Sequence, residues 1–290
     1  MQIPNIFAAS RPVFKTPPTQ TTKVYDSVDR CIYCGTTDDL TDEHIIPYGL
    51  GGRHILPRAS CRTCARITGE FEGHVLRGLW WLTRATLGYP TRRKKEMPKE
   101  YKLNVTTKSG VTKELILGEN EKFAMAGFPE YAPPASMSGY EYSHGIMMTG
   151  HRLVGFGDAV ELLAKKYDVQ TINGSVSYKG TTFPRMLAKI TYGFAVGSFG
   201  ADAFERVYVI ESILDTKDDV GMWVGGDDRP STKESADVES KQQNAVSMMV
   251  GDDRDIYFRI RLFAFCPHSP AYRVRVARLR PDVPIMPVFL

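Results

Sequence analysis

Long apolar segments are missing from this sequence of 290 residues. No apolar run approaches the roughly 18 residues that a membrane-spanning helix needs, so we expect a protein with no membrane partner. Residues 1–22 carry proline and threonine in place of the apolar core of a secretory signal, which favours a cytoplasmic location. Internal repeats are also lacking. Residues 100–290 contain no phosphate-binding loop, catalytic triad or nucleotide fingerprint, so we assign no chemistry to them.

The composition indicates a folded protein with a mildly basic charge. Hydrophobic residues make up 42% of the chain, which is enough for at least one core and too many for a disordered protein. The length suits one large domain or two ordinary ones. The formal net charge of +4 permits a nucleic-acid partner without establishing one.

Cysteine is scarce, but four of the five cysteines form two Cys-x-x-Cys pairs, Cys31/Cys34 and Cys61/Cys64. A two-residue spacer lets both thiolates of a pair face one ion, and two pairs complete a tetrahedron around Zn²⁺. In a chain without a secretory signal, such pairs favour a structural zinc site over a disulfide or redox pair, which remains the alternative. Cys266 stands alone after an apolar run and is expected to be a small buried hydrophobe.

The segment between the two cysteine pairs carries the chemistry. It reads Leu-Thr-Asp-Glu-His-Ile-Ile-Pro over residues 40–47 and is followed by Gly51-Gly52. An acidic residue directly before a histidine, then Ile-Ile-Pro and a Gly-Gly turn, all inside paired cysteines, is similar to the HNH (ββα-metal) endonuclease family. The resemblance covers roughly residues 28–75. It implies a zinc-stapled module that hydrolyses phosphodiester bonds.

The resemblance implies a role for each residue of the Glu43-His44 pair. His44 would be the general base, because a neutral imidazole can take a proton from water near pH 7. Glu43 would hold a catalytic divalent cation, Mg²⁺ or Mn²⁺, that relieves the charge on the phosphate. In an extended strand these neighbours point to opposite faces, so a bend of the chain is expected there. The alternative is an ordinary hydrogen-bonded histidine in a zinc module that cuts nothing.

The sequence departs from the family pattern directly after the last cysteine. Zinc-bearing HNH enzymes commonly place a histidine or asparagine there as a second metal ligand, whereas this chain has Ala65, which has no ligand atom. His54 and Glu72 are the preferred substitutes in that order, with Glu70 and His74 as further candidates.

Basic residues surround the motif and predict contact with the DNA backbone, most simply of double-stranded DNA. Lys/Arg rows that neutralise phosphates give affinity that is independent of base sequence. A second arginine-rich surface is expected on two C-terminal strands that carry Arg259 and Arg261, and Arg273 and Arg275; pairing with nearby acids is its alternative. We group Arg84 with the expected phosphate-contacting residues, whose principal members are Arg53, Arg58, Arg62, Arg66, Arg92, Arg93, Lys94 and Lys95.

We predict an α+β protein: an N-terminal zinc-stapled ββα-metal HNH module, then a larger α+β domain that ends in a β-hairpin. The expected divisions are an extended arm over residues 1–25, the nuclease module over 26–90, a basic linker over 91–100 and an accessory domain of unknown role over 101–290.

Periodicity locates the elements within these divisions. One helix is expected to begin near Cys61, and others are expected over residues 71–88, 158–167 and 183–204, the last interrupted or ended near Gly197–Gly200. The expected strands cover 101–118 as a hairpin, 206–213, 220–224, 255–264 and 272–279, and the expected loops cover 127–150 and 225–244.

Two functions of different classes remain open. The first is a metal-dependent HNH endonuclease, favoured by the Glu43-His44 pair. The second is a non-catalytic zinc-stabilised module that binds nucleic acid or protein, favoured by Ala65. A third hypothesis gives residues 101–290 a function of their own, such as sensing a ligand that controls the nuclease. The oligomeric state is undetermined, with a homodimer as one alternative.

Overall fold

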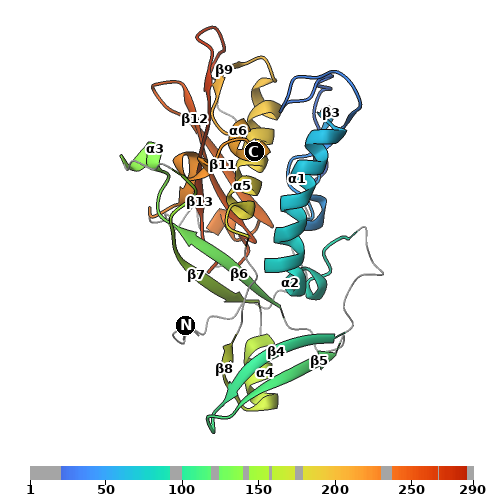
Figure 1. Ribbon diagram of the computed structural model, residues 1–290, viewed down its shortest axis with the longest axis vertical. Coiled ribbons are helices and arrows are strands. Elements are labelled where there is room, and N and C mark those ends of the chain that lie inside the picture. Colours follow the sequence, from blue (N-terminus) through green and yellow to red (C-terminus); the bar gives the residue numbers. More distant parts are fainter. Residues whose placement is uncertain are drawn as a thin grey trace.

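The structure is a computed structural model of the full chain and describes residues 21–91, 100–118, 124–139, 144–156, 159–173, 179–229, 237–266 and 268–285. Most of the expected N-terminal arm, residues 1–20, and most of the expected linker, residues 92–99, lie outside the described residues. The protein is α+β, as expected, and its described residues form four sheets with helices packed between and beside them (Figure 1).

The N-terminal part is built on a small sheet and a helix. Strand β2 (Leu40–His44) pairs antiparallel with β3 (His54–Cys61), and β1 (Lys23–Val24) joins β3 in parallel. The turn between β2 and β3 contains the short helix η1 (Tyr48–Leu50). Gly51 adopts a positive φ of 71°, and a Cβ on Gly52 would lie 2.0 Å from the Ile46 carbonyl oxygen, so the Gly-Gly pair is required by this turn.

A long helical segment follows β3 without a break. Helix α1 (Arg62–His74) begins directly at Cys61, whose thiol accepts a hydrogen bond from the Cys64 amide and so caps the first turn. A π-helical turn, η2 (Val75–Leu79), and helix α2 (Trp81–Thr86) continue the segment. The expected helix start near Cys61 is confirmed.

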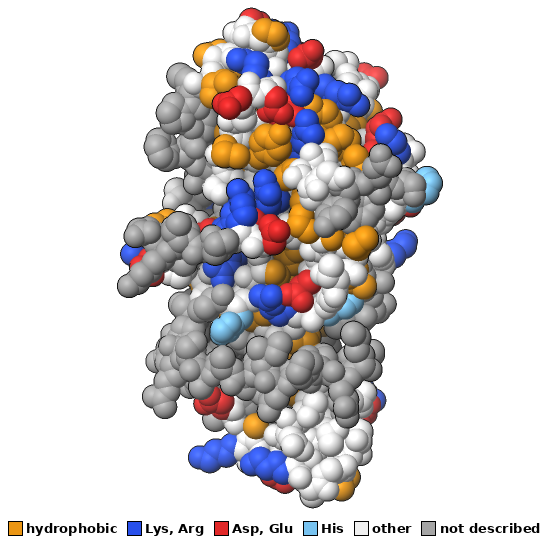
Figure 2. Space-filling view, turned by 90° about the vertical axis from the view of Figure 1, so that its left-hand side faces the viewer, with side chains coloured by type: hydrophobic (Ala, Val, Ile, Leu, Met, Phe, Trp, Pro, Cys, Tyr) orange, Lys and Arg blue, Asp and Glu red, His pale blue; other side chains and the backbone are white. Residues whose placement is uncertain are grey.

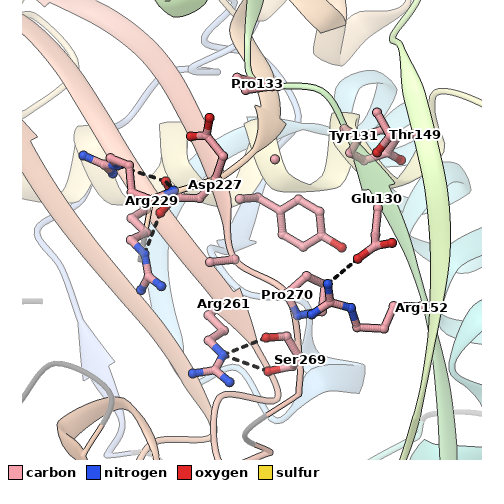
Figure 3. Close-up of a pocket in the computed structure, with 15 residues that line it drawn as sticks. Glu130, Tyr131, Pro133, Thr149, Arg152, Asp227, Arg229, Arg261, Ser269 and Pro270 are labelled. Carbon is pink, nitrogen blue, oxygen red and sulfur yellow. Dashed lines mark hydrogen bonds and ion pairs between the residues drawn. The ribbon is translucent and has the colours of Figure 1, made fainter. Parts of the chain in front are cut away.

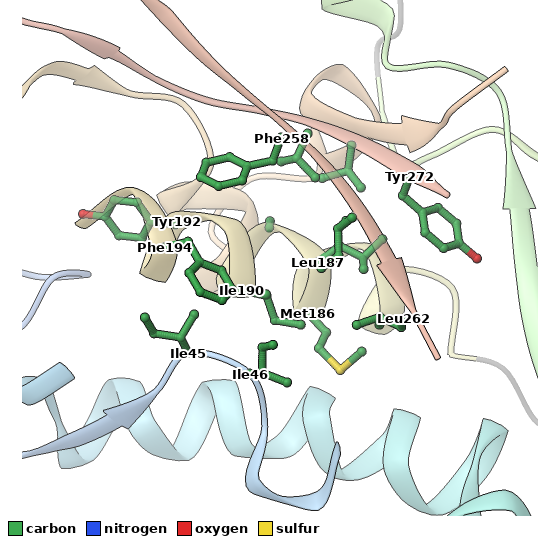
Figure 4. Packing of buried hydrophobic residues seen from close by; sticks show 14 of the residues in the cluster. Ile45, Ile46, Met186, Leu187, Ile190, Tyr192, Phe194, Phe258, Leu262 and Tyr272 are labelled. Carbon is green, nitrogen blue, oxygen red and sulfur yellow. The ribbon is translucent and has the colours of Figure 1, made fainter. Parts of the chain in front are cut away.

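Helix α5 (Thr182–Phe199) is the centre of the core. All of its residues from 182 to 196 are buried, because α1 and the β2–β3 turn cover one side and a five-stranded sheet covers the other (Figure 4). That sheet has the order β10-β13-β12-β11, with β9 also paired to β13. Its strands are β9 (Phe204–Val207), β10 (Val224–Gly226), β11 (Asn244–Val250), β12 (Asp255–Leu262) and β13 (Tyr272–Leu279).

The antiparallel pairing of β12 with β13 confirms the expected C-terminal hairpin. Alternate residues of β12 are buried against α5, as a strand with one covered face requires: Ile256, Phe258, Ile260 and Leu262.

The remaining strands form two smaller sheets. The expected hairpin at residues 101–118 is confirmed by β4 (Glu100–Thr107) and β5 (Thr112–Gly118), which pair antiparallel; β8 (Val169–Asn173) adds to β4. Helix α4 (Ala159–Tyr167) covers this sheet, which has a small core cluster of its own (Figure 1). Strands β6 (Met125–Tyr131) and β7 (Met148–Gly155) form a two-stranded sheet.

Three sequence-based assignments were wrong. The expected loop at 127–150 contains most of β6, the short helix α3 (Ala135–Ser138) and the start of β7. The expected strand at 206–213 ends at Val207 and continues as helix α6 (Ile210–Leu214). The expected strand at 220–224 is helix α7 (Val220–Trp223) followed by β10. Short apolar runs do not distinguish a strand from a single buried helical turn.

One continuous core joins the cysteine-bearing segment to the C-terminal sheet. A single cluster of buried side chains extends from Cys31 through Ile45 and Phe194 to Leu279. The division between residues 26–90 and 101–290 therefore stays a prediction. Among the described residues, no helix is both long and apolar enough to cross a bilayer.

Candidate functional site

The four paired cysteines converge on one point. Cys31 and Cys34 flank a turn before β2, Cys61 ends β3, and Cys64 lies in the first turn of α1. All four Sγ atoms lie within 4.8 Å of one another, and those of Cys34 and Cys61 are 3.7 Å apart. A tetrahedral zinc with Zn–S bonds of about 2.3 Å separates its sulfurs by about 3.8 Å, so the four thiols form a metal site of the size that zinc requires.

None of the five cysteines is joined in a disulfide, which argues against the disulfide alternative. Cys266 is buried far along the chain among Phe263 and Phe265, as expected of a small hydrophobe.

Strand β2 carries Glu43 and His44 from the metal site toward α5. Glu43 is opposite Leu56 and His44 is opposite Ile55 on β3, with a register shift between Thr41 and Glu43. The Glu43 side chain is buried, with 6% of the residue exposed, whereas His44 is half-buried. This difference follows the alternation of an extended strand.

The His44 ring lies near the surface beside a second aromatic ring. Its centroid is 5.9 Å from that of Tyr48, and the two rings meet edge to face. Tyr48 is 42% exposed, so the histidine lies next to a residue that solvent and a large ligand can reach.

The buried face of β2 meets a lysine from α5. The Nζ atom of Lys189 lies 2.5 Å from Oε1 of Glu43 and 2.9 Å from Oε1 of Glu72, which comes from α1. The same ammonium donates to the main-chain carbonyl oxygens of His44 and, at 3.3 Å, Ile45. Lys189 is 1% exposed. Burial by itself would lower the pKa of Lys189, but the Glu43 and Glu72 carboxylates outweigh it and hold that pKa above its ordinary value.

A catalytic divalent cation does not fit beside Glu43 in this arrangement. The space between the two nearest carboxylates is taken by the Lys189 ammonium, which already supplies the positive charge. Within the described part of the chain, the four cysteines are the only group of three or more His, Cys, Asp or Glu residues placed to hold a metal ion.

The other expected metal ligands lie in different surroundings. His54 is half-buried between Tyr25, whose hydroxyl is 3.2 Å from His54 Nδ1, and Phe194, whose ring centroid is 5.2 Å away. Burial, and to a lesser degree Lys23, lowers the pKa of His54. Glu70 pairs with Arg66 on the exposed side of α1. Of the expected substitutes for the ligand missing at Ala65, Glu72 is the one that the structure brings to Glu43.

Residues 31–74 match the model of the HNH endonuclease family. Because this segment is similar to that family, residues 31–74 are called the HNH segment below. It covers the four cysteines, the Glu43-His44 pair and Glu72, but not Lys189. No curated protein and no solved structure matches the chain.

The expected DNA-contacting arginines of the HNH segment are exposed, and those that form ion pairs form them at the surface. Arg58 pairs with Asp29 at 2.5 Å and Arg66 with Glu70 at 3.5 Å, and such exposed pairs contribute little to stability. Arg53 and Arg62 are exposed and form no salt bridge to the residues that the structure describes. Arg92, Arg93, Lys94 and Lys95 lie outside the described residues.

Two of these arginines differ in their distance from His44 along the hairpin. Arg53 precedes β3 at the end where His44 pairs with Ile55, and Lys23 donates its main-chain N–H to the Arg53 carbonyl oxygen. Arg62 lies at the other end, where its N–H bonds the Asp39 carbonyl oxygen. Arg53 is therefore the exposed arginine nearest in register to His44, whereas Lys23 pairs with His54 and shares the face of that residue, opposite to the face of His44. Lys23 was not expected there, because only strand pairing brings it to β3.

Arg84 does not belong to the phosphate-contacting set. It is 5% exposed and donates to three main-chain carbonyl oxygens, those of Gly49 at 2.6 Å, Leu76 at 3.0 Å and Pro90 at 3.1 Å. Its hydrogen bond to Gly49 connects α2 to the η1 turn. The sequence-based grouping of Arg84 with DNA-binding residues was wrong, because clustering in sequence does not report burial.

Sequence reasoning also missed Lys189. The signal that could have found it is a lone lysine inside the apolar run Met186 to Phe194, where a charge has to be paired once it is buried.

Three of the C-terminal arginines, Arg259, Arg261 and Arg275, pair with acids, which is the alternative that the sequence left open. Arg259 bonds Asp227 at 2.7 Å and also pairs with Glu239, while Arg261 bonds Glu239 at 3.2 Å and the Ser269 carbonyl oxygen at 2.9 Å. Asp227, Arg259, Arg261 and Ser269 line a cavity of about 470 Å³ between the C-terminal sheet and β6–β7 (Figure 3). On the side of the molecule drawn in Figure 2, basic side chains lie among acidic ones and form no continuous basic patch on the described surface.

Proposed function

We propose that this chain is a nuclease that hydrolyses phosphodiester bonds in double-stranded DNA, with His44 as the general base. The observation that supports the proposal is the HNH match over residues 31–74, a segment that includes His44 and the four cysteines. His44 is half-buried at the end of β2 that lies away from Cys61. The HNH family implies a nucleic-acid substrate, and the exposed Arg53 lies at the end of the hairpin where His44 pairs with Ile55.

The proposed chemistry uses groups of this chain. The neutral imidazole of His44 takes a proton from the attacking water, a role for which histidine is suited near pH 7. Arg53 holds the DNA backbone by charge, which contributes affinity without sequence preference. The four thiolates hold zinc and fix the start of α1 against the end of β3, so this metal supports the fold rather than the reaction.

The sequence-based hypothesis added Mg²⁺ or Mn²⁺ at Glu43. We assign no step to such an ion, because the Lys189 ammonium fills the space between Glu43 and Glu72. Glu43 instead anchors the end of β2 to α5, and the carbonyl oxygens of His44 and Ile45 accept from the same ammonium. That contact supports the position of His44 without touching the substrate.

A plasmid-nicking assay tests the proposal. His44→Ala should lower the rate of nicking of supercoiled plasmid by roughly 10² to 10⁴, the usual contribution of a positioned base. Binding of a labelled duplex should stay within about twofold of wild type, because phosphate contacts dominate affinity. Zinc content should not change. His151→Ala is the matched control, because His151 is exposed on β7 and outside the HNH segment.

Equal nicking by wild type and His44→Ala would overturn the assignment of His44. Absence of nicking by the wild-type protein, with DNA binding retained, would establish the second candidate, a non-catalytic zinc-stabilised module that binds nucleic acid. Two observations favour that candidate: the lysine between the carboxylates and the alanine at position 65.

A further inference from the structure

The ammonium of Lys189 lies in a cage of four oxygen atoms. Two are carboxylate oxygens, of Glu43 at 2.5 Å and Glu72 at 2.9 Å, and two are the main-chain carbonyl oxygens of His44 and Ile45. Carboxylates and main-chain carbonyls are the ligands that hard divalent cations prefer. An ammonium has only three N–H donors, so four oxygen neighbours suit a cation that is held by charge as well as by directed hydrogen bonds.

The core holds Lys189 in this cage. Figure 4 shows Ile45 and Ile46 of the β2–β3 turn facing Met186, Ile190 and Phe194 of α5. All five side chains are almost completely buried. On α5, Gly193 has no side chain, and a Cβ there would meet Ile45 at 3.2 Å. Lys189 therefore reaches the carboxylates from a helix that packs closely on the turn, rather than from a mobile surface segment.

Lys189 is the cation that balances this pair of carboxylates in the described structure. Arg185, one turn earlier on α5, donates to the Ile213 carbonyl oxygen and pairs with Asp215 at 3.0 Å, so its charge is committed on another side of the helix. The positive charge between the two carboxylates therefore comes from Lys189.

We propose that Lys189 is the resident cation of the HNH segment, whose ammonium occupies the position between Glu43 and Glu72 that a divalent metal would take. The folded wild-type chain then binds no divalent cation at Glu43, and removal of the ammonium opens an oxygen cage that does. This proposal concerns the same site as the proposed function and rests on it only to that extent. Its test measures metal binding, whereas the test of the proposed function measures cleavage. A failure of plasmid nicking would leave it standing.

Titration with Mn²⁺ alone, followed by electron paramagnetic resonance of the free ion, tests the proposal on the zinc-loaded full chain. Wild type should take up no Mn²⁺, whereas Lys189→Met should take up about one ion per chain. The melting temperature of Lys189→Met should rise by about 5 °C when Mn²⁺ is about a hundred times its dissociation constant, and that of wild type should not move.

Two controls make the result specific. Lys108→Met removes a surface lysine that lies 3.7 Å from Asp168 on another sheet, and it should gain no Mn²⁺. Adding Glu72→Gln to Lys189→Met removes one carboxylate from the cage and should weaken Mn²⁺ binding at least about tenfold, because divalent-ion affinity depends on ligand charge.

Each outcome decides the proposal. Uptake of Mn²⁺ by wild type that Glu43→Gln abolishes would overturn it, as would a folded Lys189→Met that takes up none. A Lys189→Met chain that folds only with Mn²⁺ supports it. If that variant stays unfolded at every Mn²⁺ concentration, Lys189→Gln replaces it, since the amide keeps two N–H donors for the same oxygens; a folded Lys189→Gln must then gain the ion or the proposal fails.

Discussion

Nζ of Lys189 lies 2.5 Å from Oε1 of Glu43, which joins the centre of the buried helix α5 to the strand that carries His44. Both side chains are nearly inaccessible to solvent, at 1% and 7% exposed. A buried ion pair of this kind adds little net stability over an apolar pair, but loss of one partner leaves an uncompensated charge in the core. The contact therefore makes the arrangement of the HNH segment depend on a residue outside it.

The Lys189–Glu43 contact predicts a non-additive effect on stability. Lys189→Met should lower the free energy of unfolding by about 3–5 kcal/mol, because two carboxylates are left without their cation. Adding Glu43→Gln should restore part of that loss, since it removes one of the two unpaired charges. Urea denaturation measures all three values. In the exposed pair Lys102–Glu114, at 3.0 Å, the corresponding changes should stay below about 1 kcal/mol. An additive double variant at Lys189 and Glu43 would contradict the prediction.

The four-cysteine site predicts bound zinc that the fold requires. Purified protein should contain about one Zn²⁺ per chain, and Cys64→Ser should lose it along with at least about 3 kcal/mol of stability, because the metal links β3, α1 and the turn at Cys31. Metal analysis and thermal unfolding check both effects. Cys266→Ala is the matched control: it alters another buried cysteine and should leave zinc content unchanged. Protein that is fully folded with no zinc would refute the site.

The exposed arginine nearest His44 in register predicts a change in the salt dependence of DNA binding. Arg53→Ala should weaken duplex binding to a similar degree for every sequence and reduce the slope of log affinity against log salt by about 1, as expected for one lost phosphate contact. Fluorescence anisotropy at several salt concentrations measures the slope. Lys113→Ala on β5 removes an exposed charge from the separate sheet and should leave the slope unchanged. Equal slopes for Arg53→Ala and wild type would remove Arg53 from the interface.

Arg84 is predicted to act on stability and not on DNA affinity. Arg84→Ala leaves the carbonyl oxygens of Gly49, Leu76 and Pro90 without their donor, which should cost about 3 kcal/mol. The salt slope of DNA binding should equal that of wild type under conditions where the variant is folded. A changed slope with unchanged stability would return Arg84 to the DNA-contacting set.

The buried carboxylate of Asp255 should make the folded protein less stable in acid. Burial acts to raise the pKa of its carboxyl group, but hydrogen bonds from Arg278, Arg275 and Tyr208 outweigh burial and lower that pKa below its ordinary value. A carboxyl group with a lowered folded-state pKa contributes stability above its unfolded-state pKa of about 3.9, and this contribution is lost as the pH falls through the folded-state value.

Asp255→Asn measures that contribution. The variant should be about 3 kcal/mol less stable than wild type at pH 7, and the difference should shrink as the pH falls below about 4. Denaturation from pH 7 to pH 2 follows the difference, and the exposed neighbour Asp252→Asn should show no such trend. A difference that stays constant with pH would mean that the charge of Asp255 does not stabilise the fold.

Local patterns were sufficient for several elements. The alternation over residues 255–264 predicted β12, and Gly200 marked the end of α5, because these signals act within a few residues of one another. They failed at residues 206–213, where an apolar run of strand length contains a strand end and a helical turn. That run is too short for the helical period of 3.6 residues to be distinguished from the strand period of two residues.

By itself, the sequence indicated the four-cysteine site and the HNH motif, because a two-residue spacer orients the thiols within each cysteine pair and the Glu-His-Ile-Ile-Pro segment is contiguous. Only the tertiary structure decided that Lys189 meets Glu43 and Glu72, that Arg84 is buried and that Lys23 lies beside Arg53. Each of these contacts joins elements that are remote in sequence. Their partners are set by how α5, α1 and the small sheet pack, and the period of a helix or strand gives the face of a residue but not what that face meets.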